Sequence, residues 1–386
     1  MQPANPLCIS GMPSTQPRLE TATAVLEVNL DAVAANYHFL SQKVAPCVCS
    51  VVVKADAYGL GMLPISRRLA QEGATRFFVA TVEEGIALRQ ALPHVTIYVL
   101  NSLWKGVEEL FETHQLVPVL ADLGQIQLWS EFAISKDKTL DAVLQVDTGL
   151  IRLGLSLFEL EQLTSHAKGL EGLRLHYVMS HLACAYQPWH PYNLEQLERF
   201  KKVRSLLPGV PASFSGSGGI FHGKDFWFDM VRPGRLLYGS SFTAEEGFKA
   251  AIQPVVRLRA RVLQVQTVLP GQSVGYDQTY VAARTCRLAT LSLGYADGYM
   301  RTLGNKAEVM FQGIKAPVVG RISMDMATVD VTDIPQPLLH PGAWVDIIND
   351  QITVDDLAQA AGTVSWEILT RLGNRPRRCY HGEVTC

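Results

Sequence analysis

Short apolar runs recur along the chain before residue 248, and segments with helical spacing separate them. Runs that are apolar on both faces are typical of parallel strands covered by helices. The candidate strands are VVVKA from Val51, FFVAT from Phe77, TIYVL from Thr96, LVPVL from Leu116, DAVLQVD from Asp141, LRLHYVMSH from Leu173, ASFSGS from Ala212 and FDMVRPG from Phe228. Eight strand–helix units predict an α/β fold that begins with a (β/α)8 barrel of the TIM type.

The pattern changes after about residue 248, where apolar and polar residues alternate in VVRLRARVLQVQTV. This alternation is typical of an antiparallel strand with one solvated face. Further β-rich runs follow, and Thr353 is a suitable N-cap for a helix over TVDDLAQAAG. We therefore predict a barrel over residues 23–247 and a C-terminal, mainly β domain over residues 248–386. A poorly ordered tail over residues 1–22 is expected to precede them, because this stretch is rich in Pro, Ser and Thr.

Composition argues against several classes of protein. With 48% hydrophobic and 18% charged residues, the 386-residue chain is typical of a compact enzyme of two domains. A net charge of −2 argues against a nucleic-acid-binding or membrane-surface protein, which normally carries a basic face. The seven scattered cysteines include no CxxC pair, so we expect free thiols and no metal site. Because the sequence has no bilayer-spanning run and no signal-peptide pattern, we expect a cytoplasmic protein.

Polar residues follow the predicted strands at their carboxyl ends, where a barrel of this type carries its chemistry. They are Lys54, Tyr58, Arg152, His181, Ser217 and Arg232. Each one alone is more often a hydrogen-bonded side chain at a strand end, but their joint placement favours a ligand site. Lys54 follows three valines, and a buried ammonium is costly to desolvate. A lysine there either extends to water or takes part in chemistry.

The motifs that carry these residues resemble, in order, the signature segments of the alanine racemases. They are VVKADAYGLG, DTGLIRLGL, SHLACA, VRPGRLLYG, SVGYDQTY, LGYADGYMR and GRISMDM, and the match extends from about residue 25 to residue 375. Members of that family are pyridoxal-phosphate enzymes with a barrel and a β domain. The resemblance implies interconversion of L-alanine and D-alanine, which would supply D-alanine for peptidoglycan.

The resemblance implies that Lys54 binds pyridoxal 5′-phosphate covalently as an imine, because a neutral amine condenses with an aldehyde and an ammonium does not. Lys54 would transfer a proton on one face of the substrate α-carbon, and Tyr276 of SVGYDQTY would do so on the other. His181 corresponds to a histidine near this tyrosine and the cofactor ring. Arg232 corresponds to an arginine that donates a hydrogen bond to the pyridine nitrogen without protonating it.

The cofactor phosphate would be bound by groups from two of these motifs, VVKADAYGLG and VRPGRLLYG, and from the GSGG segment at residues 216–219. Tyr58 and Ser217 would contribute hydroxyl groups, and Gly234 and Arg235 would contribute backbone N–H groups at a helix start. Trp366 occupies a place where a phosphate-contacting tyrosine is common in the family. We therefore expect Trp366 to belong to the cofactor site at this place.

Two further residues correspond to positions near the substrate carboxylate. Arg152 resembles the arginine that binds there, and Met324 in SMDM would offer its backbone N–H to the same group. Gln145 stands where many members carry a carbamylated lysine, so we predict no carbamate in this chain. Tyr186 replaces an acidic residue expected near the substrate entrance, which affects the expected substrate size.

The resemblance also implies a homodimer in which the β domain of one subunit covers the barrel of the other. Closure of both domains within one chain is the alternative. A racemase that prefers serine or another small amino acid stays open, as does a non-catalytic pyridoxal-phosphate carrier, although such carriers normally lack the β domain. A related decarboxylase would need a partner-subunit cysteine, and a metal-dependent aldolase would need ligands that are not apparent here.

Overall fold

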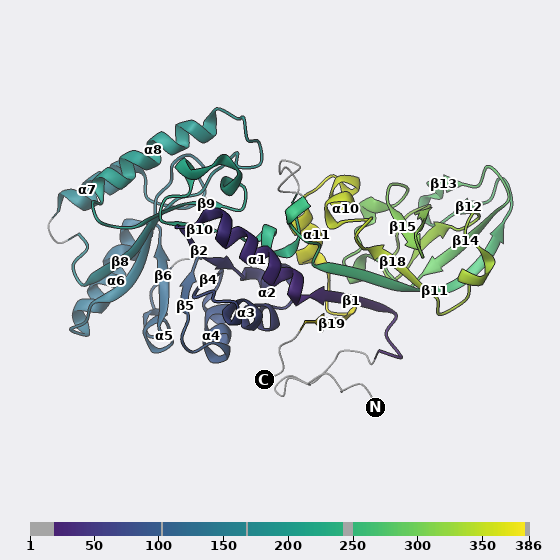
Figure 1. Cartoon of the computed structure of the whole chain (residues 1–386), viewed down its shortest axis with the longest axis horizontal. Helices are drawn as coiled ribbons and strands as arrows, with labels where there is room; N and C mark the ends of the chain where they lie inside the picture. Colours follow the sequence, from purple (N-terminus) through teal and green to yellow (C-terminus); the bar gives the residue numbers. More distant parts are fainter. Residues whose placement is uncertain (1–18, 102, 167–168, 242–249, 383–386) are drawn as a thin grey trace. The chain divides into compact units, whose positions relative to one another are not determined.

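The computed structural model describes residues 19–101, 103–166, 169–241 and 250–382. These residues form two compact units (Figure 1). One unit comprises residues 29–255 with Gly382, and the other comprises residues 19–28 and 256–381. Most of the predicted tail, residues 1–18, lies outside the described residues. Over the described ranges, no helix is long and apolar enough to cross a membrane.

In the described part of the chain, nine parallel strand segments form the barrel, in the order β2-β10-β9-β8-β7-β6-β5-β4-β3. They are β2 (Val48–Cys49), β3 (Val51–Val52), β4 (Arg76–Val79), β5 (Thr96–Val99), β6 (Leu116–Leu120), β7 (Leu140–Gln145), β8 (Leu173–Met179), β9 (Ala212–Gly216) and β10 (Met230–Arg232). The first predicted strand is split into β2, which pairs with β10, and β3, which pairs with β4. Between them, Ser50 donates its N–H and its hydroxyl to the Val231 carbonyl, at 3.0 and 2.8 Å. The predicted parallel barrel is confirmed, with its first strand joining the two ends of the sheet.

Helices between the strands begin at side-chain caps in several cases. The helices are α1 (Leu30–Val44), α2 (Lys54–Gly59), α3 (Met62–Gln71), α4 (Val82–Ala91), α5 (Glu108–Thr113), α6 (Leu123–Ser135), α7 (Leu157–Ser165) and α8 (Tyr192–Leu206). Thr81 and Glu84 form a capping box at α4, and Ser156 and Glu159 form the same arrangement at α7. Each box satisfies N–H groups that the first helical turn leaves without intrahelical partners.

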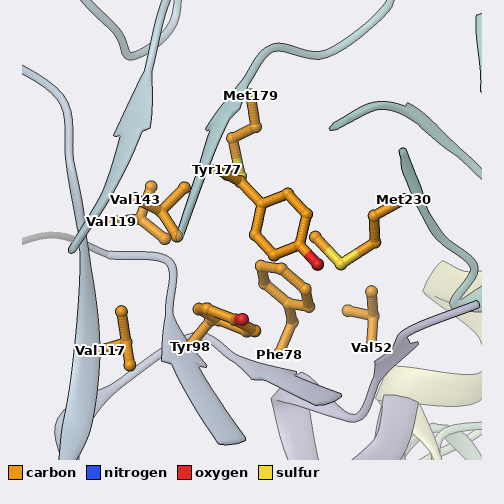
Figure 2. Packing of buried hydrophobic residues seen from close by; sticks show 9 residues of the cluster. All are labelled: Val52, Phe78, Tyr98, Val117, Val119, Val143, Tyr177, Met179 and Met230. Atoms are coloured by element: carbon orange, nitrogen blue, oxygen red, sulfur yellow. The ribbon is translucent and has the colours of Figure 1, made fainter. Parts of the chain in front are cut away.

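Large side chains pack inside the barrel, as Figure 2 shows. The Phe78 and Tyr98 rings stack with their centroids 4.6 Å apart, and the edge of Tyr177 meets Tyr98 at 6.2 Å. The cluster consists of Val52, Phe78, Tyr98, Val117, Val119, Val143, Tyr177, Met179 and Met230. A barrel filled in this way places ligand sites at its ends rather than in its centre.

The second unit is mainly β, as predicted, and is organised around the long strand β11 (Val256–Val268). β11 pairs antiparallel with β1 (Ala24–Asn29), β14 (Cys286–Leu291) and β18 (Trp344–Ile348). The other strands are β12 (Ser273–Val274), β13 (Tyr280–Val281), β15 (Glu308–Phe311), β16 (Ile314–Pro317), β17 (Ala327–Asp330) and β19 (Arg377–His381). Buried and less buried residues alternate from Val256 to Val262, in agreement with the period of two in the sequence.

Two details concern the ends of this unit. Strand β1 lies within the predicted barrel range of 23–247, but its residues 24–28 pair with β11. Hydrophobic pattern alone does not specify the partner of an isolated strand, and this pairing joins residues more than 220 positions apart. Near the other end, Thr353 caps α10 (Val354–Ala361) through a capping box, as the sequence predicts, and α11 (Ser365–Arg371) follows.

Candidate active site

Five predicted residues lie at or just after the ends of five barrel strands. Lys54 follows β3, Arg152 follows β7, His181 follows β8, Ser217 follows β9, and Arg232 is the last residue of β10. Because these strands are parallel, the five residues share the carboxyl end of the barrel. The positive charges of Arg232, Arg152 and Lys54 all act on His181. The structure therefore brings four of the predicted residues into one electrostatic cluster.

Lys54 carries an amine whose charged form is disfavoured. Burial lowers the pKa of Lys54 below its ordinary value, and the Arg152 guanidinium lowers it further. The Glu84 carboxylate opposes these two effects. Lys54 is therefore neutral in a larger fraction of the molecules, and the neutral amine is the form that acts as a nucleophile or a base.

The backbone directly after Lys54 has an unusual conformation. Residues 55–58 (Ala-Asp-Ala-Tyr) all have φ between 52° and 58°, so α2 contains one left-handed turn. Such a turn costs roughly 1–2 kcal/mol per non-glycine residue. The Asp56 carbonyl accepts from the Gly61 N–H at 2.9 Å, and its carboxylate accepts from the Met62 N–H at 2.7 Å. This turn carries Lys54 at one end and Tyr58 at the other.

Arg232 is a buried cation, with 6% of its surface exposed. Its guanidinium donates to the Ser213 hydroxyl and, at 2.6 Å, to the Ser180 carbonyl. Burial lowers the pKa of Arg232 to about 10, so the side chain keeps its proton at neutral pH. No carboxylate in the described part of the chain forms an ion pair with it. A buried guanidinium with only neutral partners favours a ligand that brings a hydrogen-bond acceptor.

His181 is held as a neutral imidazole. Burial lowers the pKa of His181 to about 3, with further lowering by Arg232, Arg152 and Lys54. A neutral ring can stack on or hydrogen-bond to a ligand without adding another positive charge to the cluster. The cluster is thus cationic through its two arginines, while His181 adds no charge.

Three polar groups converge beside β9 and β10. The Gly234 N–H donates to the Ser217 hydroxyl at 2.9 Å, and a Cβ on Gly234 would lie only 2.4 Å from the Tyr58 hydroxyl. Glycine is therefore required there to leave room for Tyr58. The 3₁₀-helix η3 (Arg235–Tyr238) begins at the next residue. Two hydroxyl groups and the N–H groups at a helix start form an arrangement that suits an anion such as phosphate.

The side chain of Arg235 lies beside this group of donors. It is 2% exposed, and its guanidinium lies over the Tyr186 ring, 4.6 Å from the centroid. Burial raises the pKa of Tyr58, and the Arg235 charge opposes that shift. The Tyr58 hydroxyl therefore stays protonated at neutral pH and can donate a hydrogen bond.

The other predicted residues belong to the β unit. Tyr276 begins the 3₁₀-helix η4 (Tyr276–Gln278) between β12 and β13 and is 69% exposed. Met324 is 54% exposed, and Trp366 is in the first turn of α11. Next to Tyr276, Asp277 forms an ion pair with Arg321 at 2.6 Å. Two of the three predicted side chains are thus presented on the surface.

Comparison with known proteins identifies the family. Residues 28–242 match the alanine racemase N-terminal domain, and residues 255–380 match the alanine racemase C-terminal domain. The chain belongs to the alanine racemase family. The resemblance noted in the sequence motifs is confirmed.

Individual relatives cover nearly the whole chain. The alanine racemase of Rickettsia canadensis is 42% identical over 357 residues, which are 92% of this chain and 98% of that relative. A catabolic alanine racemase of Agrobacterium fabrum is 42% identical over 360 residues, 93% of this chain and 92% of the relative. The crystal structure of the Bartonella henselae alanine racemase with covalently bound pyridoxal phosphate has a TM-score of 0.89 at 41% identity. That comparison covers 93% of this chain and 100% of the Bartonella chain.

One buried residue that no sequence motif identifies supports the site of this alanine racemase family member. Gln196 on α8 is fully buried, and its amide oxygen accepts from the Ala183 N–H at 2.8 Å. Its amide nitrogen donates to the His181 carbonyl and the Thr148 hydroxyl, both at 3.1 Å. Gln196 thus links the segments that follow β7 and β8. The sequence feature that could have identified Gln196 is its position among the apolar residues of α8, directly before the buried Leu197.

We expect Gln196→Ala to lower the free energy of unfolding by about 3 kcal/mol, because buried groups at 183 and 181 lose their partner. Chemical denaturation monitored by circular dichroism measures this change. Gln127→Ala on α6 is the control, since Gln127 is exposed and, among the described residues, its side chain bonds to Glu131 at 2.8 Å. It should change stability by less than about 0.5 kcal/mol. Equal effects of the two substitutions would show that the Gln196 contacts contribute nothing.

Proposed function

We propose that this protein catalyses the pyridoxal-phosphate-dependent interconversion of L-alanine and D-alanine. The observation that carries the proposal is the carboxyl end of the barrel, where Lys54, with a lowered pKa, shares a cluster with the buried Arg232. Membership of the alanine racemase family supports the same reaction. The Bartonella relative, whose cofactor is covalently bound, supports the same cofactor.

The donor set fits pyridoxal phosphate at each of its functional groups. Tyr58, Ser217 and the N–H groups of Gly234 and Arg235 would hold the phosphate, and the close approach of Tyr58 to Gly234 shapes that place. Lys54 would bind the cofactor covalently through its amine. Arg232 would donate to the pyridine nitrogen as a further neutral acceptor beside the Ser213 hydroxyl and the Ser180 carbonyl. Trp366 would line the same site.

When bound, pyridoxal phosphate withdraws electrons from the substrate α-carbon and so makes its proton removable. The neutral Lys54 amine would accept or return that proton on one face, and the Tyr276 phenol would do so on the other. Arg232 keeps its own proton because its pKa of about 10 is above neutrality. It therefore donates a hydrogen bond without transferring a proton, which limits competing reactions such as transamination.

Substrate recognition would depend on Arg152 and on the Met324 N–H, both directed at the carboxylate. Gln145 is buried, with 9% of its surface exposed. Its side chain lies close to Gly154, where an added Cβ would be 3.1 Å from the Gln145 Cγ. An amide cannot form the carbamate that a lysine forms, so this site would work without that modification. A preference for serine or another small amino acid is the alternative substrate assignment.

The assembly and biological setting belong to the proposal as well. The β domain, proposed here as residues 248–386, would contribute Tyr276 and Met324 to the active site of a partner subunit. The barrel, proposed as residues 23–247, would supply the cofactor site. We further propose that the enzyme acts in the cytoplasm and supplies D-alanine for peptidoglycan.

The proposed reaction is tested by incubating the purified holoenzyme with each L-amino acid and quantifying the D-enantiomer by chiral chromatography. We expect D-alanine to form fastest, and a higher rate with L-serine would change the substrate assignment. Borohydride reduction followed by peptide mapping should place the cofactor on Lys54. A protein that carries the cofactor but produces no D-amino acid would instead support a carrier role.

A further inference from the structure

The left-handed turn over residues 55–58 sets the relative placement of Lys54 and Tyr58. None of its four residues is glycine, so the conformation is disfavoured locally and must be held by its surroundings. Contacts with near neighbours in the chain come from Asp56, which bonds to Gly61 and Met62 as described above, and from the Ala57 N–H, which donates to the Val53 carbonyl at 2.8 Å. A further contact comes from outside it, because the Asp56 N–H donates to Glu84 Oε1 at 3.3 Å.

Glu84 makes contacts with both of its carboxylate oxygens. Oε2 accepts from the Ala80 N–H at 2.7 Å and from the Thr81 N–H at 3.3 Å, which completes the capping box of α4. Oε1 reaches back to Asp56, 28 residues earlier in the chain. One side chain thus joins the turn after β3 to the start of the helix after β4.

Glu159 forms the same kind of capping box but makes no contact comparable to the one between Glu84 and Asp56 within the described residues. Its Oε2 accepts from the Ser156 N–H and hydroxyl, both at 2.8 Å, at the start of α7. The described contacts of Glu159 all lie within this box. The two glutamates therefore share one local motif and differ in the contact with the turn that carries Lys54.

Glu84 also acts on Lys54 through its charge. The charged and titratable groups of the cluster around Lys54 are Arg152, His181, Arg232 and Glu84. Of these, Glu84 is the acidic one, and it raises the pKa of Lys54 against the lowering by burial and by Arg152. Removing the Glu84 charge should therefore lower the pKa of Lys54 further.

We propose that Glu84 is a positioning residue of the active site, whose carboxylate holds the left-handed turn, and with it Lys54 and Tyr58, against the start of α4. This inference rests on the proposed function, in which Lys54 binds the aldehyde carbon of the cofactor and Tyr58 binds its phosphate. Glu84 itself acts only through them. The capping of α4 is a separate and purely structural contribution of the same side chain.

The test compares Glu84→Gln with Glu159→Gln, which makes the same change in the other capping box. The first measurement is the rate at which diluted holoenzyme loses pyridoxal phosphate, followed by the absorbance of the bound cofactor. We expect about tenfold faster loss in Glu84→Gln, by analogy with metal sites, where removing a partner that orients a ligand weakens binding about 10- to 100-fold. Glu159→Gln should release the cofactor at the wild-type rate.

The second measurement is the pH dependence of Lys54 acetylation in the cofactor-free full chain, quantified on its peptide by mass spectrometry. In Glu84→Gln the apparent pKa of Lys54 should fall below its wild-type value, because the opposing charge of Glu84 is lost. Glu159→Gln should leave it unchanged. If the two variants match each other in cofactor loss and in Lys54 acetylation, Glu84 is only a helix cap and the proposal is overturned.

Thr81→Ala weakens the cap of α4 by removing the hydroxyl that accepts from the Glu84 N–H, and it leaves the Glu84 carboxylate and its Asp56 contact in place. It should reduce stability without changing cofactor loss. If Glu84→Gln does not fold, Glu84→Asp replaces it, and faster cofactor loss than in Thr81→Ala supports the proposal while equal loss overturns it. Borohydride labelling of the wild type tests the proposed function independently, because a label on another lysine would refute that function before any variant is made.

Discussion

Lys54→Ala is expected to lower kcat for alanine racemisation by about 10⁴-fold or more, because it removes a base and the covalent attachment of the cofactor together. Folding should be retained. The Lys54 amine is held in a site that disfavours its charge, so its removal relieves a desolvation cost instead of creating one. Chiral chromatography measures the initial rates from both enantiomers and so gives kcat. Thermal unfolding of the same samples shows whether the fold is retained.

Two controls connect such a loss to the amine itself. Lys202→Ala replaces an exposed lysine on α8 and should keep wild-type activity. Added methylamine should restore part of the activity of Lys54→Ala, because a small amine can occupy the space of the deleted side chain and transfer the proton. Wild-type rates in Lys54→Ala would eliminate Lys54 as the base, and a large drop in its thermal stability would assign the loss to folding.

The barrel and its cluster were accessible to sequence analysis for identifiable reasons. Runs such as LVPVL, buried at every position of β6, are apolar on both faces, which distinguishes parallel strands from the alternating pattern of β11. Once the strands are in place, barrel geometry brings their carboxyl ends together, so Lys54, His181 and Arg232 were expected to meet. The roles of these residues came from the family resemblance and stay predictions.

The supporting contacts were not accessible, because they depend on tertiary structure. Residues 55–58 read as Ala-Asp-Ala-Tyr, which favours an ordinary right-handed helix, and only the surrounding contacts make the left-handed turn acceptable. Glu84 reads from sequence as a helix cap, and its bond to Asp56 spans 28 residues. Gln196 bonds to Thr148 across 48 residues. Local patterns carry no information about such pairings.

Mixing two inactive variants is expected to restore about a quarter of wild-type activity, if each active site combines the barrel of one subunit with the β domain of its partner. Tyr276 is 69% exposed, as expected for a side chain that completes a site on another surface, and Met324, which would contribute its backbone N–H, is 54% exposed. In a heterodimer of Lys54→Ala and Tyr276→Phe chains, one site would have both wild-type residues and the other would have neither. Random reassociation makes half of the dimers heterodimeric, which gives about one intact site in four.

The reverse experiment separates shared sites from sites within one chain. Wild-type chains are mixed with chains that carry Lys54→Ala and Tyr276→Phe together, dissociated and reassociated, and heterodimer formation is verified by native mass spectrometry. With shared sites, every site of a heterodimer lacks one residue, so about a quarter of the sites stay active. With sites inside one chain, half stay active, and the mixture of single variants regains nothing. If heterodimers are verified, half of the activity remains in this mixture and the single variants regain none, the shared site is refuted. Lys54 and Tyr276 of one active site would then belong to the same chain.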